Sequence, residues 1–266
     1  MMREKNIFIF DLDGTIIENN KPLDKRITEK IYELEEDGHK VIFATSRSLR
    51  GIKAVLPQSL WNNTLILCNG AFVLDKGKIV LSNFINNDEC MKLISYLCSK
   101  QIQFYAELGK ELYIPDYVTH DFISLLMEEA QGERIYSDFI DICSKVYKIA
   151  VVESIEKMQF YQLSELLKTS RMYCHLDNSA DIVSAEISKW EAFMKLNIFN
   201  EYKQVIAFGN DENDIELLSN ADIGVAVATE NEDLLSVSEL RVSSCNPNMV
   251  INVIDKIIYK KEEIIS

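Results

Sequence analysis

The sequence is poor in the residues that would mark a disulfide-stapled, zinc-binding or low-complexity protein. Its 266 residues include only four prolines, and no internal repeat or compositionally biased segment is visible. The six cysteines form no Cys-x-x-Cys pair, and the three histidines are scattered, which disfavours a zinc site. Buried thiols in a reducing compartment are therefore expected in place of disulfides.

Long apolar runs and an excess of positive charge are also missing. No stretch of about 18 uncharged apolar residues offers a membrane span. The N-terminal segment MMREKNIFIFD reaches Asp11 too early for a signal peptide, so a cytoplasmic protein is expected. The chain has 28 lysines and arginines against 42 aspartates and glutamates, a formal net charge of −14. This balance disfavours nucleic acid and anionic membranes as partners.

The remaining composition is typical of a globular protein. The chain is long enough for one large domain or for a domain with an insert. The first third alternates short apolar strands with amphipathic helices. Strands are predicted over 7–10, 41–45 and 65–68, with one helix ending near Gly38 and another over 48–56. This order predicts a parallel sheet covered by helices on both faces.

The pattern changes after residue 70 and returns near residue 187. The segments AFVLD and KIVL around Lys76-Gly77 predict a hairpin. Helices are then predicted near 87–100, 119–131 and 156–168, and strands near 102–106, 145–152 and 171–176. Towards the end, a helix over 188–197 and strands over 204–208 and 223–227 restore the alternation. We therefore predict a three-layer α/β/α core, doubly wound around a mainly parallel sheet, over 1–82 and 182–266, with an inserted α+β cap over 83–181.

Polar side chains follow four of the predicted strands. The first strand ends on Asp11 and Asp13, and the others are followed by Thr45-Ser46-Arg47, by Asn69-Gly70 and by the acidic run 210–214. In open parallel sheets, ligands bind at the carboxyl ends of strands. If the extended geometry persists, Asp11 and Asp13 point to the same side and bring two like charges together. Such a pair needs a cation, and Mg²⁺ prefers oxygen ligands and also binds phosphate.

Each of these motifs has a plainer interpretation when taken alone. The segment 11–15 fits an ordinary turn after a strand. Thr45 fits the N-cap of the next helix, and the acidic run fits a solvated helix start. Lys189 fits a surface lysine at a helix start. For the polar residues that follow the strands, a common site explains their placement at one sheet edge better than separate coincidences do.

The motifs DLDGT at 11–15, ATSR at 44–47, CNGA at 68–71, ISK at 187–189 and GNDENDIELL at 209–218 resemble, in order and spacing, those of the haloacid dehalogenase superfamily. More narrowly, they are similar to its Cof-type phosphatases, whose α+β cap is inserted between the second and third motifs. The resemblance covers nearly the whole chain. It implies a Mg²⁺-dependent phosphatase of small phosphate monoesters, either sugar phosphates or phosphorylated cofactors, that works through an aspartyl-phosphate.

The resemblance also implies a role for each motif residue. Asp11 would be the nucleophile and Asp13 the general acid/base. The residues implied in phosphate or substrate binding are Thr45, Ser46, Arg47, Asn69, Gly70, Lys189 and Asn213. The residues implied in holding Mg²⁺ are Asp11, Asp13 through its backbone carbonyl, Asn210 and Asp214. The expected partner is a small phosphorylated metabolite, and the protein is expected to be a monomer or a small homo-oligomer.

Three positions depart from the family pattern. Asn210 stands where the last motif usually has Asp, Trp190 follows the motif lysine in place of glycine, and Ser46 replaces the glycine of ATGR. An amide oxygen can bind Mg²⁺ but carries no charge, so metal affinity should fall unless Asp211 or Asp214 compensates. The other two changes remove no reacting group.

Other functions fit parts of the sequence. A sugar phosphomutase shares the aspartyl-phosphate and differs in its product, an isomerised sugar phosphate. A non-catalytic descendant that binds a phosphoryl ligand is conceivable because of Asn210, although Asp11, Asp13 and Lys189 are retained. A response-regulator receiver would not need the insert. The insert is expected to act as a lid that selects substrate. Tyr105, Tyr113 and Tyr117 are candidates for contact with substrate, although packing within the cap is the simpler interpretation of each.

Overall fold

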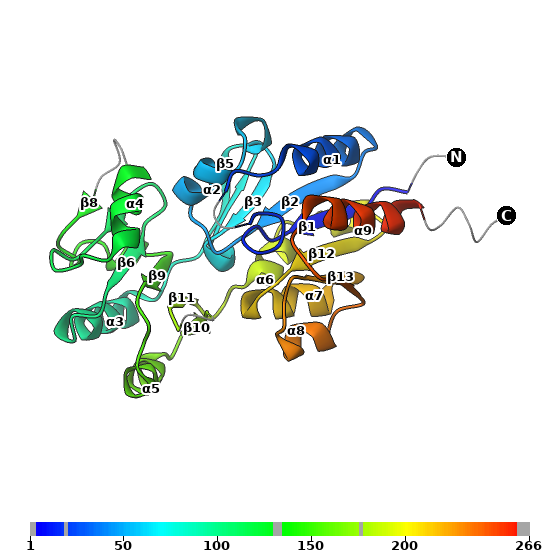
Figure 1. Ribbon diagram of the computed structural model, residues 1–266. Helices are drawn as coiled ribbons and strands as arrows, with labels where there is room; N and C mark the ends of the chain where they lie inside the picture. Colours follow the sequence, from blue (N-terminus) through cyan, green and yellow to red (C-terminus); the bar gives the residue numbers. More distant parts are fainter. Residues whose placement is uncertain (1–3, 19–20, 130–134, 176–177, 260–266) are drawn as a thin grey trace.

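The computed structural model of the protein describes residues 4–18, 21–129, 135–175 and 178–259. These residues form an eight-stranded sheet and a six-stranded sheet (Figure 1). The larger sheet is built from the two ends of the chain, and the smaller sheet from the segment between them. The fold is therefore the predicted α/β core with an inserted α+β cap. In the described ranges, no helix has both the length and the apolar character that crossing a membrane requires.

The core sheet has the strand order β14-β13-β12-β1-β2-β3-β4-β5. Its strands are β1 Ile7–Phe10, β2 Lys40–Ala44, β3 Thr64–Leu67, β4 Phe72–Asp75, β5 Lys78–Ser82, β12 Val205–Gly209, β13 Ile223–Val227 and β14 Leu240–Val242. Neighbours from β14 to β3 are parallel, whereas β4 and β5 run antiparallel. The strand order reverses beside β1, which lies between β2 and β12. Ligands bind at this switch point in doubly wound sheets.

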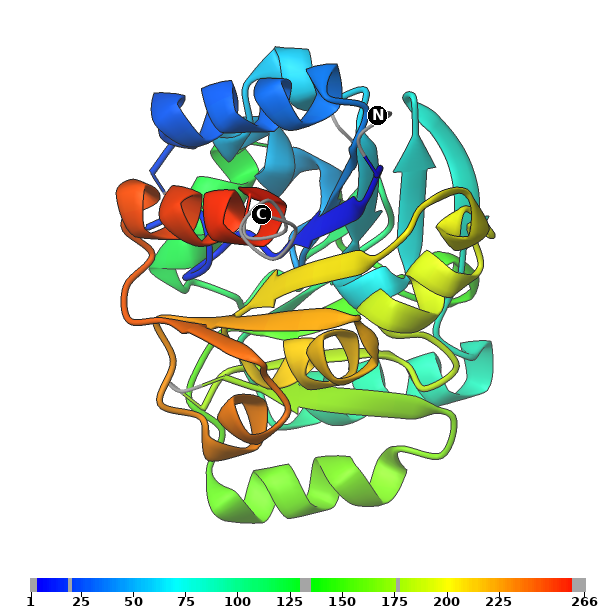
Figure 2. The ribbon, with the colours of Figure 1, turned by 90° about the vertical axis from the view of Figure 1, so that its right-hand side faces the viewer.

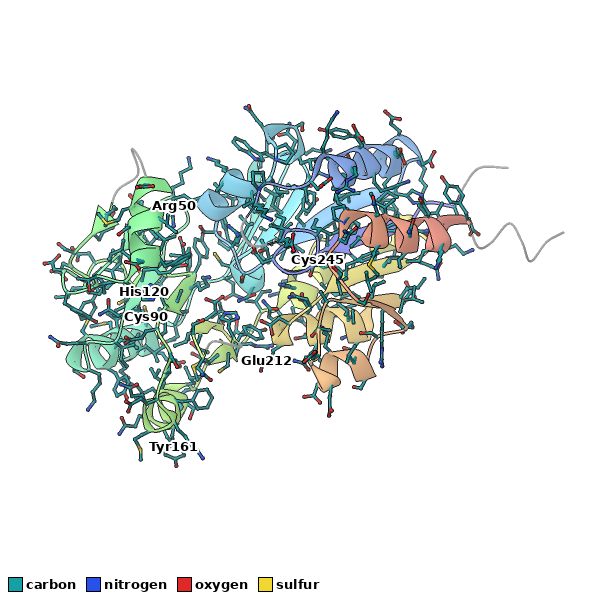
Figure 3. The ribbon with its side chains drawn as sticks, in the orientation of Figure 1. Arg50, Cys90, His120, Tyr161, Glu212 and Cys245 are labelled. Carbon is teal, nitrogen blue, oxygen red and sulfur yellow. The ribbon has the colours of Figure 1, made fainter. Side chains whose placement is uncertain are left out.

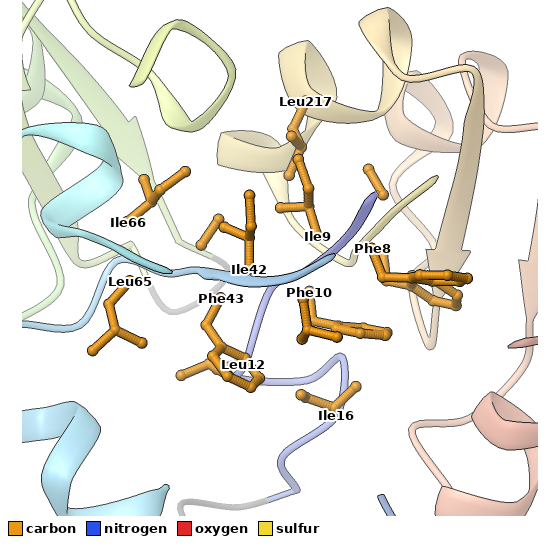
Figure 4. Close-up of a cluster of buried hydrophobic side chains, with 14 of the residues drawn as sticks. Phe8, Ile9, Phe10, Leu12, Ile16, Ile42, Phe43, Leu65, Ile66 and Leu217 are labelled. Carbon is orange, nitrogen blue, oxygen red and sulfur yellow. The ribbon is translucent and has the colours of Figure 1, made fainter. Parts of the chain in front are cut away.

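Helices cover both faces of the core sheet, and the strands β1, β3 and β12 are buried along their whole length, whereas the edge strand β5 is largely exposed. The helices of the core are α1 Lys25–Glu36, α2 Leu49–Val55, α6 Lys189–Met194, α7 Ile215–Asn220, α8 Glu232–Ser236 and α9 Pro247–Tyr259. Along β1, Ile9 points to the face beneath Leu217 of α7, whereas Phe8 and Phe10 point to the other face (Figure 4). Helices α1 and α9 lie side by side on that second face (Figure 2). The Lys30–Asp255 ion pair, 2.9 Å long, joins them.

The cap sheet has the strand order β10-β11-β9-β6-β7-β8. The elements of the cap are α3 Asn87–Ser99, β6 Phe104–Glu107, β7 Leu112–Tyr113, α4 Asp121–Glu129, β8 Ile135–Tyr136, β9 Lys148–Val151, α5 Lys157–Leu166, β10 Ser170–Cys174 and β11 Ala180–Ser184. Side chains alternate along these strands. Phe104 and Ala106 of β6 join the apolar cluster formed with α3 and α5, whereas Tyr105 and Glu107 point away from that cluster. The face that carries Glu107 therefore meets the core.

The predicted elements are confirmed with shifted boundaries, whereas β7, β8, β11, β14 and the helices α8 and α9 were not predicted. Strands β7 and β8 were not predicted because two residues are too short to show a period. Strand β11 contains the expected boundary between residues 181 and 182, and it pairs with the cap strands β9 and β10. We therefore propose that the cap extends to Ser184. Residues 130–131 of the predicted helix 119–131, and residue 176 of the predicted strand 171–176, lie outside the described residues.

Candidate active site

The first motif forms a tight turn directly after β1. Asp11 is 5% exposed, and its Oδ2 accepts a hydrogen bond of 2.8 Å from the Thr15 hydroxyl. Gly14 has a φ of +77°, and a Cβ there would lie 2.1 Å from the amide nitrogen of Asn210. Only glycine meets both conditions without strain. The turn therefore brings the first motif against the loop that follows β12.

Lys189 joins the first motif to the last. It begins α6 after the N-cap Ser188, and its side chain is 1% exposed. Its Nζ lies 2.8 Å from Asp11 Oδ1 and 2.7 Å from Asp214 Oδ1. Burial by itself lowers the pKa of Lys189, but the two carboxylates outweigh burial and raise this pKa above its usual range. The interpretation of Lys189 as a surface lysine is wrong, because its charge is buried between two carboxylates.

The carboxylates of the site outnumber its buried cation. Burial raises the pKa of Asp11 to about 7; Lys189 opposes this increase, and the negative charges of Asp214 and Asp13 add to it. Each of these carboxylates would be stabilised in its charged form by a further cation. The electrostatics of the site therefore favour a bound cation.

The oxygen atoms available for a metal come from the first and last motifs. Asp11 Oδ2 and Asn210 Oδ1 lie 2.8 and 3.5 Å from the same Thr15 hydroxyl, so they converge. Carboxylate and amide oxygens are ligands that Mg²⁺ accepts, so these residues fit the metal. Within the described ranges, no group of three or more His, Cys, Asp or Glu side chains identifies a metal centre by itself.

Asp214 supports the last motif from inside. It is fully buried, which makes the interpretation as a solvated helix start wrong for this residue. Its Oδ2 accepts hydrogen bonds from the backbone N–H groups of Asn210 and Asp211 at 3.0 and 3.3 Å, and its Oδ1 accepts from Lys189. Asp214 therefore fixes the loop that presents Asn210.

The segment after β2 contacts both the first motif and the cap. Arg47 forms a two-point ion pair with Asp13, with Nε–Oδ2 and Nη2–Oδ1 distances of 2.7 Å. The hydroxyl of Thr45 accepts from the N–H of Arg47 at 3.1 Å, whereas Ser48 caps helix α2. The N-cap interpretation of Thr45 is therefore wrong. Ser46 meets the cap through its carbonyl oxygen, which accepts from Lys148 at 2.9 Å.

Asn69 and Gly70 after β3 hold neighbouring parts of the site together. Asn69 has a φ of +56°, a conformation that asparagine tolerates better than most residues. Its amide nitrogen donates to Asp181 of the cap at 3.1 Å, and its oxygen accepts from Asn213 at 2.8 Å. At Gly70 a Cβ would lie 2.2 Å from the carbonyl oxygen of Ser188. Gly70 therefore allows the close approach of the chain that carries Lys189.

Charged cap residues that the sequence did not single out make polar contacts with the core. Glu107, Lys148 and Asp181 lie on neighbouring strands of one sheet face. Both carboxylate oxygens of Glu107 accept from Nη2 of Arg50 at 2.7 Å, and both side chains are nearly fully buried. Figure 3 labels Arg50 on the cap-facing side of the core. Lys148 also pairs with Asp181 at 3.0 Å.

A second contact joins the cap to the last motif. The ring of His175 lies 3.3 Å from Asp211 and 3.7 Å from Asp181. The hydrogen bond to Asp181 and the weaker effect of the one to Asp211 raise the pKa of His175 to about 10, whereas burial acts to lower it. Glu212, labelled in Figure 3, accepts from the backbone N–H of Cys174 at 3.3 Å. The last motif is thus in contact with both the first motif and the cap.

The raised pKa of His175 predicts how its contribution to stability depends on pH. This contribution is complete below pH 6.5 and is lost as the pH rises through about 10. We expect the difference in free energy of unfolding between the wild type and His175→Asn to shrink across this range, as measured by urea denaturation. His120→Asn is the control, because no ion pair joins His120 to a carboxylate elsewhere in the described chain. A difference that does not change with pH would show that His175 is uncharged.

A cavity of about 620 Å³ lies beside Asp13, between the core and the cap. Asp13 and Arg47 line it from the core, and Tyr105, Phe122 and Lys148 line it from the cap. The structure thus places a buried cluster of charged groups next to a space that an organic group could fill. The buried cluster contains Asp11, Lys189 and Asp214.

Known proteins share this fold over nearly the whole chain. A family model described as haloacid dehalogenase-like hydrolase matches residues 8–254. The 5-amino-6-(5-phospho-D-ribitylamino)uracil phosphatase YbjI of Escherichia coli (strain K12) is 21% identical over 255 residues, covering 93% of this chain and 94% of its own. The HAD subclass IIB sugar phosphatase BT4131 superposes with a TM-score of 0.78 at 16% identity, over 95% of this chain and 98% of its own. TM0651 from Thermotoga maritima superposes with a TM-score of 0.77 at 20% identity, over 95% of this chain and 97% of its own.

Proposed function

Because the chain belongs to the haloacid dehalogenase-like hydrolase family, we propose that it is a Mg²⁺-dependent phosphatase of small phosphate monoesters. The observation that carries the proposal is the convergence of Asp11, Lys189 and Asp214 within hydrogen-bonding distance at one edge of the sheet. The relatives YbjI and BT4131 are named as phosphatases, which supports the same activity. Phosphate monoesters hydrolyse very slowly without a catalyst, so a positioned nucleophile and electrostatic stabilisation meet a chemical need.

The two aspartates of the first motif would divide the chemistry. A carboxylate oxygen of Asp11 attacks phosphorus, the bond between phosphorus and the ester oxygen breaks, and Asp13 donates a proton to the departing alcohol. Asp13 then takes a proton from the water that hydrolyses the aspartyl-phosphate. Arg47 binds both oxygens of Asp13 in this structure, so it holds Asp13 in place and must release one oxygen for the proton transfer.

The remaining site residues would bind and stabilise the phosphoryl group. Lys189, next to Asp11, places a positive charge where negative charge develops. The Thr45 hydroxyl is a further candidate donor. Asp11, the backbone carbonyl of Asp13, and Asn210 would hold Mg²⁺, which supplies charge neutralisation for the phosphoryl oxygens. Asp214 would keep Asn210 in position through the backbone of the loop.

Phosphate release is the direct test of this function. We expect the protein to release inorganic phosphate from members of a panel of phosphorylated metabolites in the presence of Mg²⁺, and chelation of the metal should abolish release. An isomerised sugar phosphate without free phosphate would identify a phosphomutase. Binding of beryllofluoride without any turnover would identify a non-catalytic binding protein.

Asn210 should raise the Mg²⁺ concentration that the enzyme requires. Restoring a charge with Asn210→Asp is expected to lower the half-saturating Mg²⁺ concentration for hydrolysis of ethyl phosphate, because a carboxylate attracts the ion more strongly than an amide does. The Mg²⁺ concentration that gives half of the maximal increase in Tm should also be lower in Asn210→Asp than in the wild type. Asn220→Asp, on the exposed end of α7, adds the same charge away from the site and is the control. If Asn210→Asp leaves both half-saturation values unchanged, Asn210 does not bind the metal.

A further inference from the structure

The cavity beside Asp13 is suited to the alcohol portion of a substrate. Its volume of about 620 Å³ is within the range of sites for small organic ligands. The proposed phosphoryl position, between Asp11 and Lys189, is separate from this cavity. The proton donor Asp13 is part of the cavity wall, so an alcohol bound here would have its ester oxygen next to Asp13. The side chains around this space therefore determine which alcohols fit.

The cap contributes an aromatic and aliphatic wall to this cavity. Helix α4 carries Phe122, Leu125 and Leu126 at positions i, i+3 and i+4, so they share one helix face. All three line the cavity, and Phe122 and Leu125 remain 39% and 56% exposed. The ring of Tyr105 on β6 lies 6.2 Å from the ring of Phe122, at an angle of 44°. Exposed apolar side chains that gather beside a catalytic group are typical of a ligand site.

The buried charged groups of the cap wall, Glu107 and Lys148, are already paired with protein atoms, whereas Glu128 of α4 is exposed. Glu107 accepts from Arg50, and Lys148 donates to the carbonyl oxygen of Ser46 and to Asp181. A polyhydroxylated sugar that used Glu107 or Lys148 as partners for its hydroxyl groups would have to break these buried ion pairs, and unpairing a buried charge is costly. A flat apolar ring would leave them intact.

Tyr105 supplies one polar group for such a ring. It is 5% exposed and lines the cavity. Its hydroxyl makes no hydrogen bond to another residue within the part of the chain that the structure describes. It is therefore available to donate one hydrogen bond to a heteroatom on an otherwise apolar ring.

We propose that this cavity selects phosphate esters in which the alcohol carries a flat, largely apolar ring, in preference to sugar phosphates, and that Phe122 and Tyr105 hold the ring. The inference rests on the proposed phosphatase function and names the substrate class of that site. The bond that breaks is the same for both classes, so selection occurs in the contacts of the alcohol and not in the chemistry of the phosphoryl group.

Three esters of primary alcohols test this selection, because the bond that breaks is alike in all of them. We expect kcat/KM for 2-phenylethyl phosphate to exceed those for glucose 6-phosphate and ethyl phosphate by about tenfold or more. In Phe122→Ala, the fold-decrease in kcat/KM should be about ten times larger for 2-phenylethyl phosphate than for ethyl phosphate, because only the first ester loses a contact between rings. Circular dichroism confirms that the variant is folded.

Phe160→Ala is the matched control. Phe160 lies on α5 of the cap and is 40% exposed, close to the 39% of Phe122, but it does not line the cavity. Phe160→Ala should leave the ratio of kcat/KM for 2-phenylethyl phosphate to kcat/KM for ethyl phosphate unchanged. The inference would be overturned if the wild type had equal kcat/KM values for 2-phenylethyl phosphate and glucose 6-phosphate. It would also be overturned if Phe122→Ala lowered kcat/KM equally for 2-phenylethyl phosphate and ethyl phosphate. Either result would leave the phosphatase function standing. No phosphate release from any ester would overturn the phosphatase function and this inference with it.

Discussion

Replacing Asp11 by Asn is expected to lower phosphate release by at least about 10⁴-fold in kcat, because the neutral amide cannot attack phosphorus. The fold should remain intact. Asn keeps the shape of Asp and can still accept a hydrogen bond from Lys189. Burial and the negative charge of Asp214 raise the pKa of Asp11, so losing this charge should not destabilise the protein. Phosphate release and Tm measure the two expectations separately.

The control for Asp11→Asn is the same chemical change at a surface position. Asp233 lies in the first turn of α8, where its side chain is exposed. The variant Asp233→Asn should therefore leave kcat unchanged. Near-normal turnover in Asp11→Asn would reject Asp11 as the nucleophile. A collapse of Tm together with activity would show a structural role instead.

Replacing Arg50 by Leu is expected to open the cap. Glu107 would lose its ion-pair partner and keep only the hydrogen bond of Ser48 and the nearby charge of Lys148. Removing one partner of a buried ion pair costs about 3–5 kcal/mol. Burial already raises the pKa of Glu107, and Arg50 opposes this increase. Because the pair joins the cap to the core, moving the cap returns Glu107 to water and avoids the cost. Small-angle scattering should therefore show a larger radius of gyration for Arg50→Leu than for the wild type.

Removing both charges should restore the closed arrangement. In the double variant Arg50→Leu/Glu107→Leu no buried charge is left unpaired, and apolar side chains replace the pair. The control Arg26→Leu breaks an ion pair with Asp24 on the surface, where such pairs contribute about 0–1 kcal/mol. If Arg50→Leu is as compact as the wild type, the pair does not hold the cap closed.

The core and the residues at its strand ends could be predicted from the sequence because the signals are local. Strand β1 is a short apolar run, and Asp11 follows it directly. A parallel sheet brings the carboxyl ends of such strands to one edge, so Asp11 and the loop at 210–214 were expected to meet. The buried position of Lys189 between two carboxylates follows from the same topology.

The contacts between the cap and the core could not be predicted, because they depend on how two sheets meet. Glu107, Lys148 and Asp181 lie in different cap strands, and no spacing in the sequence relates them to Arg50 or Ser46. One signal was present, since a charged residue within or beside an apolar run such as KIAV needs a buried partner. The sequence did not indicate which partner this would be. The pairing of Arg47 with Asp13, which lies within the core, was not predicted either, because both side chains were expected to face the substrate.

The most direct test of the central claim is to find which residue carries the phosphoryl group. With an aryl phosphate, whose phenolate leaving group needs no proton from Asp13, the variant Asp13→Ala should form the aspartyl-phosphate but hydrolyse it slowly, since it lacks the base that activates water. After incubation with the aryl phosphate labelled in its phosphoryl group, followed by acid quenching and proteolysis, we expect the label on the peptide that contains Asp11, in a bond that hydroxylamine cleaves. Label on any other residue, or rapid turnover with no label on the protein, would contradict the assignment of Asp11 as the nucleophile.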